Sequence, residues 1–86
     1  MKKIVLLLAP YLLDQEIYVI QDNVTVETID TTIDKLSETL FATADKYKTL
    51  QVDIIGPKQY SRGIKKQIET KELATYNVNN LQINII

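Results

Sequence analysis

The longest apolar run in the chain lies in the β-prone segment 3–9, where every residue after Lys3 is apolar, and ends at Pro10. This run has no alternating polar positions, and a strand of that kind is usually buried on both faces. It therefore predicts a strand at the centre of a sheet. Residues 16–21 form a second β-prone run, and residues 24–29 alternate apolar and polar side chains with a period of two. Asp22 and Asn23 separate these runs, so the pattern predicts a β-hairpin that continues an antiparallel meander.

A helical period replaces the strand period after residue 30. Thr31 and Asp34 resemble a helix start, with a hydroxyl N-cap and an acid in the first turn. Apolar side chains then recur at spacings of three and four, and Phe41 widens the stripe; its members are Ile33, Leu36, Leu40, Ala44 and Tyr47. The spacing predicts an amphipathic helix of about four turns.

The last third of the chain alternates strand and helix patterns. Residues 51–55 predict a short strand, and Gly56-Pro57 predicts a second helix starting near Lys58. One face of that helix carries Tyr60, Ile64, Ile68 and Leu73. Asn77, Asn79 and Asn80 favour a turn before an alternating strand at residues 81–86.

The predicted order is β-β-β-α-β-α-β, with right-handed crossovers between the parallel strands of the second half. This order defines an α+β fold in which two helices pack on a mixed sheet, on one face or on both.

Composition narrows the chemistry. The chain has 86 residues, so residues 1–86 are expected to form a single domain with a small core. It contains neither Cys nor His. Disulfides, thiolate catalysis, histidine general bases and the usual zinc ligands are therefore absent, and no cofactor is expected. The apolar start is too short to span a bilayer and lacks a cleavage site, which favours a buried strand in a cytoplasmic protein without membrane attachment.

Charge is balanced overall and uneven along the chain. The net charge is −1, yet residues 14–45 hold eight acids and one base, whereas residues 46–71 hold seven bases and two acids. The two halves could pair internally or present opposite faces to a partner. Solvated faces are the simpler interpretation.

The predicted order resembles the core of the ribonuclease-H-like fold, in which three antiparallel strands precede alternating helices and parallel strands. Active members place a metal-binding acid in the first strand, but residues 3–9 contain none. Asp53 matches the acid expected near the fourth strand, and Ala9-Pro10-Tyr11 replaces the glycine-rich phosphate turn of actin-like members. The resemblance therefore implies a relative without the catalysis. Length and composition are also similar to those of small bacteriophage or mobile-element proteins.

Acidic side chains offer one candidate chemistry. Asp14, Glu16 and Asp53 are the carboxylates that could bind metal for phosphoryl transfer, with solvated loop acids as the alternative. Asp53 is unusual because it interrupts an apolar strand. If buried, it must be paired, for example with a lysine, or carry a proton.

The start of the second predicted helix is another candidate site, for anion or nucleic-acid binding. Residues 56–63 match neither a P-loop nor a nucleophile elbow, although a helix start with Lys58, Ser61 and Arg62 could hold an anion. The same segment is the alternative nucleic-acid-binding surface, which would consist of Lys58, Tyr60, Arg62, Lys65 and Lys66.

Three apolar residues follow the first strand: Tyr11, Leu12 and Leu13. If exposed they would form an interface, and if buried they would cap the core. We expect a non-enzymatic module that binds a protein partner or a second copy through these residues and the helix start at 58–66. Nucleic-acid binding is the alternative, and a metal-dependent nuclease relative is disfavoured.

Overall fold

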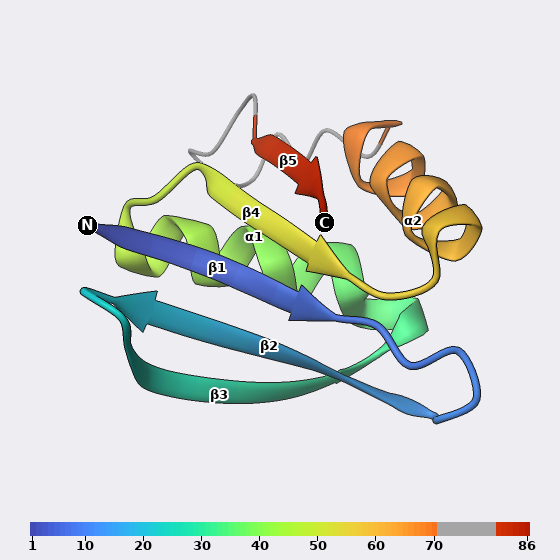
Figure 1. The fold of residues 1–86 in the computed structure, drawn as a ribbon, viewed down its shortest axis with the longest axis horizontal. Helices are drawn as coiled ribbons and strands as arrows, with labels where there is room; N and C mark the ends of the chain where they lie inside the picture. Colours follow the sequence, from blue (N-terminus) through green and yellow to red (C-terminus); the bar gives the residue numbers. More distant parts are fainter. Residues whose placement is uncertain (71–80) are drawn as a thin grey trace.

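A computed structural model describes residues 1–70 and 81–86. Five strands form one mixed sheet in the order β3-β2-β1-β4-β5 (Figure 1). The strands are β1 (Lys2–Leu7), β2 (Asp14–Gln21), β3 (Val24–Thr32), β4 (Gln51–Ile55) and β5 (Gln82–Ile85). β1 lies at the centre, antiparallel to β2 and parallel to β4, so the predicted α+β class, element order and central strand are confirmed.

Both helices, α1 (Leu36–Tyr47) and α2 (Lys58–Thr70), pack on the same face of the sheet. Leu40 of α1 and Ile68 of α2 belong to one buried cluster with Ile4, Leu6 and Ile54 of the sheet. The prediction leaves open whether the helices cover one face of the sheet or both, and they cover one. This is expected for right-handed crossovers that advance in one direction across a sheet. Neither described helix is long and apolar enough to cross a membrane.

The other face of the sheet carries no helix within the described residues. Lys3, Val5 and Leu7 of β1 lie on it, alternating with the helix-facing Ile4 and Leu6. Val5 is 9% exposed, but Lys3 and Leu7 are only half-buried. The predicted burial of β1 on both faces is therefore met at its centre and not at its ends.

The start of the first helix differs from the prediction. Thr31 is not an N-cap, because the ladder between β2 and β3 continues as far as Asp14 and Thr32. The Thr31 hydroxyl donates instead to Oγ1 of Thr39, over 3.0 Å. A 3-10 turn, Ile33–Lys35, then leads into α1, and Thr32 makes no capping hydrogen bond through its side chain. Pairing with β2 therefore keeps Thr31 in β3, and Thr31 does not cap the helix.

The hairpin turn, the fourth strand and the start of the second helix agree with the prediction. Asp22 and Asn23 both have positive φ, 53° and 66°, as a two-residue hairpin turn requires. β4 matches its predicted bounds, and α2 begins at Lys58. The predicted positions Leu73, Asn77, Asn79 and Asn80 lie outside the described residues.

The two glycines are expected to respond in opposite directions to alanine. A Cβ on Gly63 would meet nothing within 4 Å, so Gly63→Ala should stabilise α2 by about 1 kcal/mol through helix propensity. A Cβ on Gly56 would lie 3.0 Å from Cβ and 3.1 Å from the carbonyl oxygen of Leu8. Gly56→Ala should therefore destabilise the fold by about 1–3 kcal/mol through overpacking. Urea unfolding of both variants measures the difference, and equal effects would contradict this packing of β4 against β1.

Candidate interaction surface

The connection between β1 and β2 exposes three large apolar side chains in succession. Tyr11, Leu12 and Leu13, here called the apolar loop, are 98%, 64% and 89% exposed. They do not cap the core, so the interpretation that required burial is wrong for these residues. Exposed apolar residues are common singly, but a consecutive group on one loop is typical of a contact surface.

A buried glutamine holds the apolar loop in shape. Gln15 is 1% exposed, and its side-chain amide makes three hydrogen bonds to the backbone of the loop. Its Oε1 accepts from the Ala9 amide, while its Nε2 donates to the carbonyl oxygens of Ala9 and Leu12 at 3.0 and 3.1 Å. The Leu12 amide closes the turn by donating to the Ala9 carbonyl oxygen, over 3.0 Å. These hydrogen bonds hold the backbone of the loop in one conformation.

The apolar loop and the start of α2 leave the sheet at the same end (Figure 1). The Leu8 amide donates to the carbonyl oxygen of Ile55 over 2.8 Å, and Gly56 lies directly against Leu8. Ile55, at this end of β4, is 41% exposed and adds apolar area. β1 and β4 are parallel neighbours, so their carboxyl ends bring together the two segments that the sequence proposed as one surface.

The cations of α2 point largely to solvent. Lys58, Arg62 and Lys66 are exposed and Lys65 is half-buried, and none forms an ion pair among residues 1–70 and 81–86. Tyr60, by contrast, packs against the hydrophobic core. Tyr60 is therefore part of the support of α2, and the candidate surface is composed of the four cations and the apolar loop.

Asp53 is buried and paired on the helix-free face of the sheet. It is 9% exposed, and its Oδ2 lies 3.5 Å from Nζ of Lys3. Nδ2 of Asn84 on β5 donates to its Oδ1 over 3.5 Å. A lysine partner was one of the alternatives considered for a buried Asp53, and this pairing accounts for the carboxylate within an apolar strand.

The three carboxylates considered for metal binding are not brought together. Glu16 lies on β2 and Asp53 on β4, and β1 separates these strands, so two strand spacings of about 4.8 Å each intervene. Asp14 begins β2, further along the same strand. Among the residues that the structure describes, no group of three or more Asp or Glu side chains could hold a metal ion.

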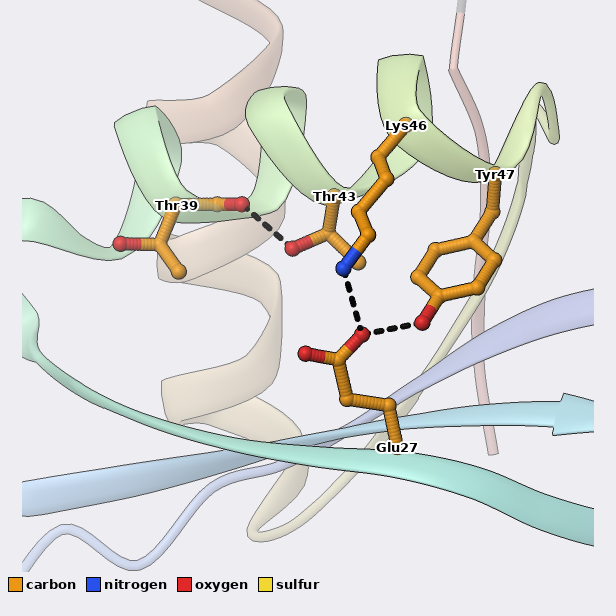
Figure 2. Close-up of polar contacts among 5 residues, drawn as sticks. All are labelled: Glu27, Thr39, Thr43, Lys46 and Tyr47. Atoms are coloured by element: carbon orange, nitrogen blue, oxygen red, sulfur yellow. Dashed lines mark hydrogen bonds and ion pairs between the residues drawn. The ribbon is translucent and has the colours of Figure 1, made fainter.

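A cluster that the sequence did not reveal joins the hairpin to α1 (Figure 2). Oε1 of Glu27 on β3 accepts from Nζ of Lys46, at 3.1 Å, and from the hydroxyl of Tyr47. The hydrogen bond from Tyr47 is the largest cause that lowers the pKa of Glu27, and the hydrogen bond from Lys46 is the next. Period-two alternation correctly placed Glu27 on a strand, but its partners are about 20 residues away and no local pattern connects them.

The Glu27 cluster predicts a pH dependence of stability. The folded pKa of Glu27 lies below its ordinary value of 4.5, so its stabilising contribution is present at neutral pH and is lost as the pH falls through the folded pKa. Glu27→Gln should therefore flatten the decline in unfolding free energy between about pH 5 and pH 3. Urea unfolding of the wild-type chain and the variant across that range tests this. Asp22 is present in both proteins, so its titration contributes equally to both curves. Parallel curves for the two proteins would contradict it.

Two hollows among the described residues lie at the opposite end of the sheet. One, of about 500 Å³, is lined by residues that include Lys2, Tyr47 and Gln82, and one of about 350 Å³ by residues that include Lys3 and Asn23. Both are distant along the strands from the apolar loop, which projects from the fold.

Comparison of the chain with protein families, curated proteins and solved structures finds no match.

Proposed function

We propose that this chain is a small, non-catalytic protein-binding module, and that the apolar loop and the start of α2 form its binding surface. The observation that carries the proposal is the exposure of Tyr11, Leu12 and Leu13 on a loop held by the buried Gln15 amide. Because these hydrogen bonds hold the loop in one conformation, a partner that covers these side chains gains apolar burial without a large ordering cost.

The same surface combines apolar and cationic groups. Aromatic and apolar anchors surrounded by a polar rim are typical of protein interfaces, and Lys58 and Arg62 supply cations at the same end of the sheet as the apolar loop (Figure 1). We further propose that the fold is a ribonuclease-H-like relative without catalysis. The strand directions and the order of helices support this, and the absence of an acid from β1 argues against the metal chemistry of active members.

Paired substitutions test the binding surface. Leu13→Ser removes an apolar side chain that is 89% exposed, and Leu50→Ser makes the same change at a 44% exposed site at the other end of the fold. In affinity capture from lysate of the native host, the partner retained by the wild-type chain should be lost with Leu13→Ser and kept with Leu50→Ser. Equal capture by both variants would overturn the proposed surface.

Nucleic-acid binding is the second candidate function, favoured by the four α2 cations without ion pairs among the described residues. Phosphate contacts release counterions, so affinity must fall steeply with rising salt. A salt titration with single-stranded and duplex oligonucleotides tests it, with the double substitution Lys58→Gln/Arg62→Gln as the comparison. Salt-dependent binding that this variant loses would support the second function, and no binding at low salt would remove it.

A further inference from the structure

No strand lies beyond β3 on its side of the sheet among the described residues. β3 is nine residues long and pairs with β2 alone. Figure 1 shows it as the outermost strand on its side of the sheet. Edge strands are usually blunted by charged side chains, proline, β-bulges or short length, because their free N–H and C=O groups accept further strands. β3 is long and has neither lysine nor proline, its charged residues Glu27 and Asp30 are acids, and the register shift opposite Val19 and Ile20 leaves residues 27–32 as the regular stretch.

The charge around this edge has one sign. Residues 14–34 contain six acids and no base. Asp22 is paired with the amino terminus at 2.7 Å and Glu27 with Lys46 at 3.1 Å. Asp14, Glu16, Asp30 and Asp34 have no ion pair within residues 1–70 and 81–86.

Two of these acids face each other across the strands. Glu16 and Asp30 are direct neighbours in the β2–β3 register, on the helix-free face of the sheet. Like charges in that position are destabilising. The Tyr18 hydroxyl donates to Oε2 of Glu16 over 2.9 Å, and this hydrogen bond is the main cause that raises the pKa of Tyr18. A cation beside Asp30 would relieve the repulsion.

We propose that β3 binds an extended basic peptide segment of a protein partner as a sixth strand. The backbone of residues 27–32 supplies the hydrogen bonds, and Asp30, which Glu16 repels across the ladder, selects lysine or arginine at the peptide position beside it, on the helix-free face. A second copy of this chain is a poorer occupant, because it would bring two acidic edges together. The surface is distinct from the apolar loop, so the proposal does not depend on that loop having a partner.

A hexapeptide of alternating lysine and threonine, acetylated and amidated, is the probe. Titrated into the full-length ¹⁵N-labelled chain at low salt, it should shift the amide resonances of residues 27–32. A counterpart N-methylated on the amides of one edge keeps the charge but cannot complete the ladder, and it should bind about tenfold more weakly or worse. Equal binding by the two peptides would overturn the addition of a strand.

A charge variant tests the acidic pair. Glu16→Gln/Asp30→Asn should weaken binding of the alternating peptide by about tenfold, and the fold should survive because the substitution removes a repulsion. Glu38→Gln/Glu69→Gln makes the same change in net charge at two exposed helix positions and should leave binding unchanged. Equal losses for the two variants, or no binding to the wild-type chain, would overturn the proposal. A concentration-dependent dimer that the peptide disperses would assign the edge to a second copy and would also overturn it.

Discussion

Leu6→Ala is expected to lower the free energy of unfolding by about 2–5 kcal/mol, which is a large share of the stability of so small a domain. Leu6 is fully buried at the centre of β1 and contributes to the cluster that joins the sheet to both helices. Alanine there would leave a cavity between the sheet and the helices, and neighbouring strands hold the backbone too rigidly to close it. Urea unfolding followed by circular dichroism measures the loss.

The adjacent residue provides the control. Leu7 is half-buried on the helix-free face, so Leu7→Ala should cost clearly less than Leu6→Ala. A difference of this sign between neighbouring leucines follows from a sheet that is covered by helices on one face. Equal losses at the two positions would show that both faces of β1 are covered in solution, which would contradict the arrangement described here.

Gln15→Leu is expected to release the apolar loop. Leucine has a similar volume but removes the three hydrogen bonds that the amide makes to Ala9 and Leu12, which leaves the Ala9 amide and the Leu12 carbonyl oxygen unpaired. The loss should be about 1–3 kcal/mol of unfolding free energy. Amide hydrogen exchange at Ala9 and Leu12 should accelerate by at least about tenfold relative to the centre of β1, since the loop would open locally.

Gln15→Glu separates hydrogen bonding from side-chain size. It retains the acceptor for the Ala9 amide but loses the donors to the carbonyl oxygens of Ala9 and Leu12. Exchange at Ala9 should therefore rise less than in Gln15→Leu, because the Ala9 amide keeps its acceptor. Unchanged protection at both amides in Gln15→Leu would mean that the loop is ordered by something other than this side chain.

Much of the fold was predictable because its determinants are local. The uninterrupted apolar run placed β1 at the sheet centre, the Asp22-Asn23 pair located the hairpin turn, and the spacing of Leu36, Leu40 and Ala44 identified α1. The helix start was wrong because Thr31 matched a capping motif while the β2–β3 ladder, a non-local interaction, retained it in the strand.

The residues of the apolar loop could be predicted from the sequence, but the contacts that hold the loop could not. Apolarity after a strand identified Tyr11, Leu12 and Leu13, but whether they were exposed depended on how the loop closes. Gln15 lies just before the strand predicted at residues 16–21, and its inward-pointing amide is decided by the register of the longer β2. The pairing of Glu27 with Lys46 and Tyr47 depends on where α1 crosses the hairpin, which residue spacing does not specify.

Site-specific photo-crosslinking tests the central claim most directly, namely that the apolar loop contacts a protein partner. A photo-crosslinking amino acid in place of Tyr11 should give a discrete covalent adduct in the native host, because that side chain is 98% exposed on the proposed surface. The same amino acid in place of Ala42, an exposed position on α1, should give none. No adduct from position 11, or the same adduct from both positions, would contradict the account.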